Sequence, residues 1–356
     1  MSLLDVQTAA GAIFEPCPGG PPQSHFGDAA SEYAAARSTA ALFDLSDRTQ
    51  IEITGADRAK FLHNFCTNDV RGLQPGQGCE AFICNVQGKI LGHVFIFVAP
   101  DSIVIDTVAS AAPALLKHLE KYHITEDVSF QDRTPDWGAL FVTGPQAATT
   151  LTTLGLPGDS LALNAHAAGE WKGTTVYVRR LEWLALPGWE VVAPREQLAE
   201  LWLALQQAGA KPAGSHAWQP LRIEACFPIY SVDIADDNLA QEIARTSQAI
   251  SFTKGCYLGQ EPIARIDALG HVNRELRGIR FEPGPVPTPG TELGMSANAS
   301  RPTGRITSSA LSFGTNAPVA LAYMKRSFDT PGQSVRVAVG EETLSGVLFS
   351  STSEPK

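Results

Sequence analysis

One pattern occurs twice in the chain and restricts the folds open to it: an apolar strand, a Thr-Gly turn and the start of a helix. The first copy is Gln50-Ile-Glu-Ile53 followed by Thr54-Gly-Ala-Asp57, and the second is Ala139-Leu-Phe-Val142 followed by Thr143-Gly-Pro-Gln146. Alternating residues indicate the strands, and apolar residues spaced three or four apart indicate the helices. We therefore predict a duplicated α+β unit. Chance recurrence of a common motif is the alternative.

The rest of the chain predicts further elements of both kinds. With 356 residues, the chain is too long for one ordinary core, so two or three domains are expected. Residues 81–98 predict a β-hairpin, and residues 29–38 and 195–208 predict helices. From about residue 272, short strands separated by Gly, Pro, Asn and Thr predict a small all-β barrel or sandwich.

Charge and hydropathy limit the partners. A formal charge of −10 and a pI near 5.3 argue against direct binding of nucleic acid or an anionic membrane. The most apolar run, residues 90–99, is too short to cross a bilayer, and the N-terminus lacks the basic start and apolar core of a signal peptide. We expect a cytoplasmic monomer without a membrane span.

No metal site is predicted. No pair of the six cysteines has C-x-x-C spacing, and Cys79 and Cys84 should face opposite sides of one strand, so we expect no Cys-ligated zinc or iron–sulfur site within the chain. The acidic loop Asp233-Ile-Ala-Asp-Asp-Asn-Leu239 is interpreted as a solvated turn rather than a divalent-cation site.

The stretch with the most chemistry is Lys254-Gly-Cys-Tyr-Leu-Gly-Gln-Glu261. It combines a cation, a thiol, an aromatic ring and two glycines, and Pro262 pushes Glu261 toward extended geometry, so a regular helix is not expected. A loop of this kind is typical of a functional site. The alternative is a tight turn whose cysteine is buried.

This stretch resembles the K-G-C-Y-x-G-Q-E signature of the YgfZ-type folate-binding proteins, which are relatives of the glycine-cleavage T-protein, an aminomethyltransferase. Four weaker elements resemble those of the same family and occur in its order. They are Thr67-Asn-Asp-Val70, Thr143-Gly-Pro-Gln-Ala147, the presumed strand Leu221-Arg-Ile-Glu-Ala225, and Gly304-Arg-Ile-Thr-Ser308.

The resemblance implies an α+β fold, a three-lobed aminomethyltransferase-like ring around a central folate. Two interleaved α+β lobes would precede a small C-terminal β-barrel. The first lobe would comprise residues 1–47 and 136–225, the second residues 48–135 and 226–271, and the barrel residues 272–356.

The resemblance also implies a site for tetrahydrofolate or a one-carbon-substituted tetrahydrofolate between the first two lobes. Glu224 would contact the pterin, because a carboxylate pairs with an aminopyrimidine edge through two hydrogen bonds. The alternative for Glu224 is a strand-end carboxylate paired with Arg222 or another base, and the alternative for Trp183, the expected stacking ring, is core packing. The remaining candidate cofactor-binding residues are Arg222, Tyr257, Gln260 and Glu261, and the candidates for a basic pocket mouth are Lys254, Arg265 and Arg274.

One sequence difference distinguishes this chain from the T-proteins. The T-proteins carry an Asp-Asp pair where this chain has Gly92 and His93, and one carboxylate of that pair serves aminomethyl transfer. His93 is either a base near neutral pH or a packed strand histidine, and the second is favoured. Aminomethyl transfer is therefore not expected.

Three functions stay open from the sequence. The favoured one is a folate-dependent protein that supports assembly or repair of iron–sulfur enzymes, including tRNA-modifying enzymes, with client iron–sulfur proteins as partners. The others are an aminomethyltransferase or other one-carbon transferase, and a folate-binding scaffold without chemistry. In the favoured function, Cys256 is the candidate catalytic thiol and is exposed beside the folate. The Lys254 ammonium would approach the sulfur and lower the pKa of the thiol, and Glu261 would oppose this lowering if it came equally close.

Overall fold

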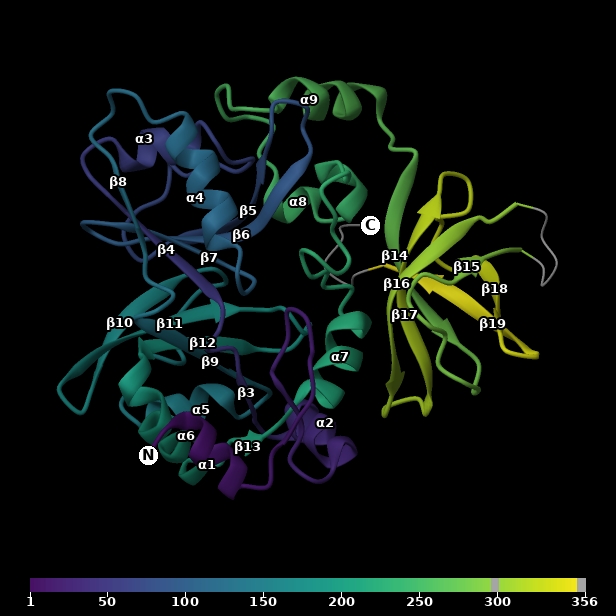
Figure 1. Cartoon of the computed structure of the whole chain (residues 1–356), viewed down its shortest axis with the longest axis horizontal. Helices are drawn as coiled ribbons and strands as arrows, with labels where there is room; N and C mark the ends of the chain where they lie inside the picture. The colour runs from purple at the N-terminus through teal and green to yellow at the C-terminus, as the bar shows by residue number, and fades with distance from the viewer. Residues whose placement is uncertain (296–300, 351–356) are drawn as a thin grey trace.

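The computed structural model describes residues 1–295 and 301–350 and has three parts, each built on its own sheet (Figure 1). The first lobe holds a six-stranded sheet that is antiparallel except for its parallel β13–β3 edge pair. In sheet order its strands are β10 (His166–Trp171), β11 (Thr174–Leu181), β12 (Gly188–Pro194), β9 (Trp137–Thr143), β3 (Ala41–Asp44) and β13 (Lys211–Pro212). A short hairpin of β1 (Ile13–Phe14) and β2 (Gln23–His25) lies before it in the chain.

Helices cover both faces of this sheet. One face packs against α1 (Leu3–Ala9), α5 (Ala147–Thr153) and α6 (Leu198–Gln207), the last preceded by the 3-10 turn η1 (Arg195–Gln197). The other face packs against α2 (Ala29–Ser38) and α7 (Ser215–Glu224) through aromatic residues. Helix α2 begins where the Asp28 carboxylate accepts the backbone N–H groups of Ala30 and Ser31.

The second lobe holds a five-stranded antiparallel sheet, also covered on both faces. In sheet order its strands are β5 (Gly78–Cys84), β6 (Ile90–Val98), β7 (Ile103–Thr107), β4 (Thr49–Thr54) and β8 (Ser129–Asp132). Helices α3 (Arg58–His63) and α4 (Ala112–Lys121) pack on one face, and η2 (Ala240–Ile243), α8 (Thr246–Ala249) and α9 (Gln260–Leu269) pack around the other.

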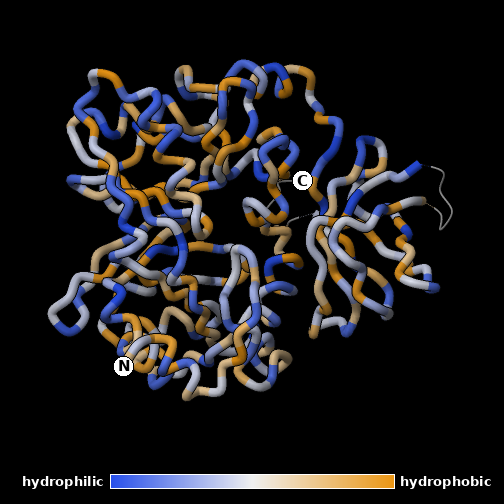
Figure 2. The backbone as a smooth tube through the Cα atoms, in the orientation of Figure 1, coloured by the Kyte–Doolittle hydropathy of each residue, from blue (hydrophilic) through white to orange (hydrophobic). Residues whose placement is uncertain are grey.

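The third part is a nearly closed antiparallel barrel. In sheet order its strands are β15 (Glu292–Leu293), β16 (Gly304–Ser312), β17 (Ala317–Lys325), β14 (Arg274–Phe281), β19 (Glu342–Phe349) and β18 (Ser334–Val339). Two backbone hydrogen bonds between Gly294 and Arg336 join its edges. Helix α7 packs against β16 and β17 and so connects the barrel to the first lobe. In Figure 2 hydrophobic stretches follow the strands and helices inside each part.

The repeated strand–turn–helix pattern is confirmed in both lobes, as β4 with α3 and as β9 with α5. Its glycines have left-handed backbones, with φ of +101° at Gly55 and +119° at Gly144. A Cβ would lie 2.1 Å from the Asp127 carbonyl oxygen at Gly55 and 2.6 Å from the Thr39 carbonyl oxygen at Gly144. Both turns therefore require glycine. The fold class is confirmed, and among the described helices none is long and apolar enough to span a bilayer.

Two local predictions are wrong. Residues Leu221–Glu224 end helix α7 instead of forming a strand, because Ala217, Trp218 and Leu221 place a helical apolar stripe against the first sheet. The stretch after Gly259 is helix α9, with Glu261 helical rather than extended. Pro262 is tolerated there because the first-turn N–H groups of a helix have no intrahelical acceptor.

Candidate functional site

A small cavity, called here the central cavity, lies where the two α+β lobes meet. Its volume is about 10 Å³, which is room for roughly one water molecule. Strand β6 supplies His93 and Phe95, helix α7 supplies Trp218, and the segments that follow β11 and α7 supply the other aromatic rings. The lining residues are Gly19, Arg48, His93, Phe95, Val108, Trp183, Trp218, Phe227, Pro228, Ile229 and Tyr230. Aromatic and apolar groups thus form most of the wall.

Two tryptophans of the wall carry buried donors without a partner. The Nε1 atoms of Trp183 and Trp218 are buried and have no hydrogen-bond partner among the described residues. Trp183 is 1% exposed and stacks on Phe141 and Phe227, with ring centroids 5.1 and 5.8 Å apart. It is therefore both a core residue and a wall residue, and its N–H is an unused donor whose burial is costly unless a ligand or water accepts it.

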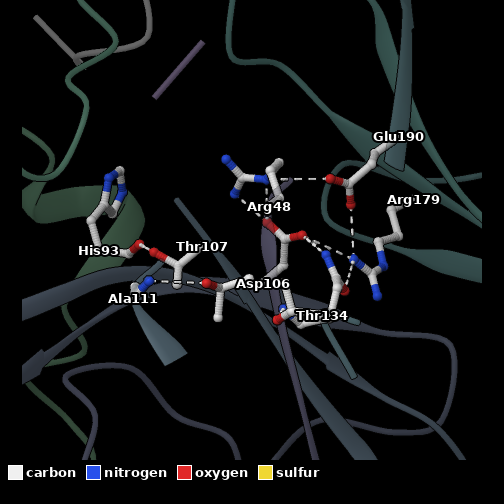
Figure 3. A network of polar contacts seen from close by, with 10 residues as sticks. Arg48, His93, Asp106, Thr107, Ala111, Thr134, Arg179 and Glu190 are labelled. Carbon is white, nitrogen blue, oxygen red and sulfur yellow. Dashed lines mark hydrogen bonds and ion pairs between the residues drawn. The ribbon is translucent and has the colours of Figure 1, made fainter. Parts of the chain in front are cut away.

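A positive charge lies against one of these rings: the Arg48 guanidinium is 4.4 Å from the centroid of the Trp183 ring. Arg48 belongs to a buried network that joins the lobes (Figure 3). Its Nε donates to Asp106 at 2.7 Å and lies 3.4 Å from a Glu190 oxygen, and Arg179 Nη1 donates to Glu190 at 2.8 Å. Burial first, and then the Asp106 charge, raise the pKa of Glu190 to about 7.

Sequence reasoning missed this network. The available signal was a charge inside an apolar strand, as at Asp106 in β7, Arg179 in β11 and Glu190 in β12. Such residues are buried only when they are paired, so each of them predicts a partner.

His93 lies in the cavity wall but is committed to another partner. Its Nε2 lies 2.7 Å from Glu80 Oε1, and Arg245 donates to both oxygens of Glu80. Burial opposes ionisation of Glu80, yet the charge and hydrogen bonds of Arg245, with the contact to His93, lower the pKa of Glu80 to about 2. Burial lowers the pKa of His93, so the imidazole is neutral near pH 7. The histidine favoured from sequence as a packed strand residue is indeed buried, 5% exposed.

A loop closes the cavity on one side. Residues 16–20 and Pro22 line an adjoining pocket of about 330 Å³, which shares Gly19, Arg48 and Val108 with the central cavity. Gly19 has φ +68°, and a Cβ there would lie 2.2 Å from Ile229 Cγ2. The loop is therefore seated directly against the cavity wall, and only glycine fits at its contact point.

Glu224 and Trp183 do not share a pocket. Glu224 lies in a separate cavity of about 340 Å³ between the first lobe and the barrel, together with Tyr33, Arg37 and Ser312. It accepts hydrogen bonds from Tyr33 Oη at 2.8 and 3.0 Å and from Ser312 Oγ at 2.6 Å, and Arg37 Nη1 lies 3.3 Å away. Of the alternatives open from sequence, the geometry matches pairing with another base, and that base is Arg37 rather than Arg222.

Arg222 has a structural position. It is 1% exposed and donates to Asp233 at 2.8 Å and to Ser308 at 2.7 Å, linking α7 to the acidic loop and to β16. The acidic loop is thus only partly a solvated turn, since Asp233 is 2% exposed and also accepts the hydroxyls of Thr307 and Ser308. The prediction was wrong for Asp233 because sequence does not show the barrel hydroxyls that reach it.

The loop of the Lys-Gly-Cys-Tyr signature lies at the end of α3. Lys254 Nζ donates to the carbonyl oxygens of His63, Cys66 and Asn68 at 2.6, 2.7 and 2.8 Å. These three bonds use all three ammonium protons, so the predicted approach of Lys254 to the Cys256 sulfur is wrong. Cys256 is exposed, as expected, but it is not among the described residues that line the central cavity.

The rest of the signature builds the start of α9. The Tyr257 ring lies 4.7 Å from Lys254 Nζ, and Gln260 Oε1 accepts the Tyr257 N–H at 3.2 Å. Glu261 and Arg265 line a pocket of about 480 Å³ beside α9. Arg274 is paired with Asp237 and Glu242. The basic pocket mouth predicted from Lys254, Arg265 and Arg274 is therefore not formed, and Arg48 is the cation that lines the central cavity.

The described residues contain no cluster suited to a metal. Within residues 1–295 and 301–350, no group of three or more His, Cys, Asp or Glu side chains is placed to hold an ion. Cys79 and Cys84 lie in hydrophobic clusters on opposite faces of the second sheet.

Two family models match the chain. Residues 4–254 match the GCVT N-terminal domain, and residues 274–351 match the glycine cleavage T-protein C-terminal barrel domain. The first match covers the two α+β lobes up to Lys254, and the second covers the barrel.

Similar proteins span most of the chain. An aminomethyltransferase of Frankia alni is 28% identical over 333 residues, covering 88% of this chain and 87% of that protein. A putative chloroplastic transferase of Arabidopsis thaliana is 26% identical over 310 residues, covering 86% and 69%. The crystal structure of the glycine cleavage system aminomethyltransferase T from Bartonella henselae superposes with a TM-score of 0.88 at 22% identity, covering 98% and 96%. That likeness concerns the fold.

Proposed function

Because the chain belongs to the GCVT family, we propose that it binds a reduced folate in the central cavity without transferring an aminomethyl group, and that it supports iron–sulfur enzymes through Cys256. The ligand is tetrahydrofolate or a one-carbon-substituted tetrahydrofolate. The observation that carries the folate part is the cavity wall: aromatic rings, one guanidinium and two indole N–H groups without a hydrogen-bond partner among the described residues.

The wall suits a pterin. The ring offers carbonyl and nitrogen acceptors, which Trp183 and Trp218 can meet with their N–H groups, and Phe227 and Tyr230 add aromatic surface. Arg48 supplies positive charge next to the same rings. Bound folate would supply a carrier for a one-carbon unit, and the residues of this chain would hold and orient it.

Binding requires the cavity to open. Pockets for small ligands usually measure about 300–1,000 Å³, whereas the central cavity holds about 10 Å³. The adjoining pocket of about 330 Å³ is separated from it by the loop around Gly19. Movement of this loop away from Ile229 joins the two spaces, so we assign the loop as the route of entry.

Absence of aminomethyl transfer follows from His93. A carboxylate can orient and deprotonate an amine, but the wall presents an imidazole that Glu80 already binds, and Arg245 holds Glu80. The test is folate-dependent release of ammonia from the aminomethylated carrier protein of glycine cleavage. We expect no turnover above background, and rates on the order of 1 s⁻¹ would contradict the proposal.

A second function has a specific observation in its favour. The Frankia alni relative, 28% identical over most of its length, is named aminomethyltransferase, which favours a T-protein activity or another one-carbon transfer. The ammonia assay separates the two functions, since folate binding is common to both and turnover is not.

The iron–sulfur part depends on the exposed thiol. Cys256 is the exposed cysteine, Cys66, Cys79 and Cys84 are buried, and Cys17 and Cys226 are intermediate. An accessible thiol can exchange with a client protein or bind its soft metal. We expect Cys256→Ser to fail, and Cys226→Ser to succeed, in restoring iron–sulfur enzyme activity, including that of tRNA-modifying enzymes, to a deletion strain. Full rescue by Cys256→Ser would overturn this part. We infer no direct contact with nucleic acid or membrane.

A further inference from the structure

Cys17 lies in the loop that borders the central cavity, and its sulfur has a fixed hydrogen-bond donor. Gln219 Nε2, from helix α7, donates to Cys17 Sγ at 2.9 Å. Arg222 orients this amide, because its Nε donates to Gln219 Oε1 at 2.6 Å. Arg222 is itself 1% exposed and donates to Asp233 at 2.8 Å, which holds the guanidinium in place. The amide oxygen therefore belongs to Arg222, and the amide N–H group is left for the sulfur.

The space next to this sulfur borders a second donor. Gly20 closes the turn, since its N–H donates to the Cys17 carbonyl oxygen at 3.1 Å. A Cβ added at Gly20 would lie 2.9 Å from Cys17 Sγ and 3.4 Å from Trp218 Nε1. Trp218 is 2% exposed, and this nitrogen has no hydrogen-bond partner among the described residues. A small acceptor beside Gly20 would therefore lie close to both the sulfur and an indole N–H group that needs a partner.

A small reagent can reach the sulfur. Cys17 has intermediate exposure and lines the adjoining pocket of about 330 Å³. It stands between Pro16 and Pro18, whose rings restrict the backbone on both sides, so the thiol keeps its place in the pocket. No other cysteine is among the described residues that line this pocket. An oxidised sulfur here has hydrogen-bond donors around it, and no thiol of the same pocket converts it to a disulfide.

We propose that Cys17 is a site of oxidation by hydrogen peroxide or an alkyl hydroperoxide, and that Gln219 and Trp218 hold the resulting sulfenate. The sulfur attacks one oxygen of the hydroperoxide, so an S–O bond forms and the O–O bond breaks. The other oxygen leaves with the thiol proton as water or an alcohol, and the sulfenic acid releases its own proton to solvent. The sulfur loses two electrons, and the hydroperoxide gains them.

The two donors give this product its stability. The new oxygen accepts the N–H groups of Gln219 Nε2 and Trp218 Nε1, and a hydrogen bond to an ionised oxygen is roughly twice as strong as one between neutral groups. The inference goes beyond the proposed function. It concerns neither folate binding nor the Cys256 thiol.

The test treats the reduced full chain with an equimolar amount of hydrogen peroxide and then with dimedone, which reacts with sulfenic acids. Mass spectrometry quantifies the dimedone adduct on each cysteine peptide. Cys226 is the internal reference, because its exposure is also intermediate. We expect the adduct at Cys17 to exceed that at Cys226 by about fivefold or more, the effect of one hydrogen bond on the product. A ratio within about twofold would overturn the proposal.

A pair of glutamine substitutions tests the first donor. Gln219→Leu removes the N–H group from the sulfur, while Arg222 keeps its contact with Asp233. We expect the Cys17 adduct to fall about fivefold or more in this variant. Gln207→Leu, at an exposed position of α6, should leave the adduct unchanged. An unchanged adduct in Gln219→Leu would overturn the proposal, and if that variant does not fold, the wild-type ratio of Cys17 to Cys226 decides.

A pair of tryptophan substitutions tests the second donor. Trp218→Phe removes the indole N–H group beside Gly20, and Trp183→Phe removes the other unpartnered indole N–H group of the cavity wall. We expect the Cys17 adduct to fall about twofold or more in Trp218→Phe and to stay unchanged in Trp183→Phe. Equal adducts in the two variants would overturn the assignment of Trp218. Each readout comes from the Cys17 peptide, so the outcome is independent of the ammonia, folate and Cys256 experiments.

Discussion

At the scale of single residues, two tryptophans that line the central cavity have indole N–H groups without a hydrogen-bond partner among the described residues. A buried indole N–H that lacks a partner costs stability in the free protein, and a ligand that accepts it removes that cost on binding. Trp183 and Trp202 each contain such an N–H, but Trp183 lines the cavity and Trp202 lies in the α6 cluster on the other face of the first sheet. This contrast provides a matched pair of substitutions.

We expect Trp183→Phe to weaken tetrahydrofolate binding by about 2- to 10-fold, the effect of one lost hydrogen bond of roughly 0.5–1.5 kcal/mol. Trp202→Phe should leave the dissociation constant unchanged. Titration calorimetry on both variants measures this. Equal effects of the two substitutions would show that the indole of Trp183 is only a packing group.

The resemblance predicts that Glu224 contacts the pterin, whereas Glu224 lines a cavity other than the one proposed here for folate. We therefore expect Glu224→Ala to change tetrahydrofolate affinity by less than about twofold while lowering the free energy of unfolding by about 1–3 kcal/mol, because Tyr33 and Ser312 lose an acceptor. Urea unfolding and calorimetry together check this. A loss of affinity of tenfold or more would restore the original assignment.

The Glu80 carboxylate makes the free energy of unfolding depend on pH in the acid range. Its folded-state pKa, about 2, lies below the usual 4.5, so the folded state holds fewer protons than the unfolded state between these values. The contribution of Glu80 to the free energy of unfolding is present above about pH 4.5 and is lost as the pH falls toward 2. We expect Glu80→Gln to cost about 3–5 kcal/mol at pH 7 by leaving Arg245 unpaired, with a smaller difference at pH 3. Urea unfolding of the wild type and of Glu80→Gln at both pH values measures this. A stability difference that is larger at pH 3 than at pH 7 would contradict the prediction.

At the scale of elements, the loop through Gly19 is the proposed route of entry to the central cavity. Substitution by alanine would place a methyl group against Ile229 and add the strain of a left-handed backbone. Gly11, with φ +85° and no atom within 4 Å of its added Cβ, has the strain without the contact. Comparing alanine substitutions at Gly19 and Gly11 therefore separates the effect of displacing the loop from the effect of backbone strain.

We expect Gly19→Ala to displace the loop, increase acrylamide quenching of tryptophan fluorescence and speed tetrahydrofolate association, whereas Gly11→Ala should do neither. Stopped-flow fluorescence measures the association rate. Unchanged quenching and unchanged association in Gly19→Ala would show that the ligand enters elsewhere.

Elements with a local cause were predictable, and those that depend on distant partners were not. The Thr-Gly turns at Gly55 and Gly144 were found from their local pattern, because the left-handed backbone at both positions favours glycine. Leu221–Ala225 was assigned to a strand because five residues do not show a helical stripe that begins at Ala217. Arg222 and Glu224 are neighbours in sequence, yet one reaches Asp233 and the other Tyr33, and only the packing of α7 between lobe and barrel decides this.

At the scale of the whole molecule, the site exists because the lobes are interleaved. The chain leaves the first sheet after β3, builds the second sheet with β4 to β8, and returns with β9. His93 from the second lobe and Trp183 from the first thereby line one cavity, although 90 positions separate them. The buried network of Arg48, Asp106, Arg179 and Glu190 holds this junction together.

The central claim is that the cavity between the lobes binds a reduced folate. The most direct test is titration calorimetry of the wild-type protein with tetrahydrofolate under anaerobic conditions. We expect saturable binding of one folate per chain, accompanied by quenching of tryptophan fluorescence because Trp183 and Trp218 line the cavity. No heat and no quenching at high micromolar tetrahydrofolate would contradict it.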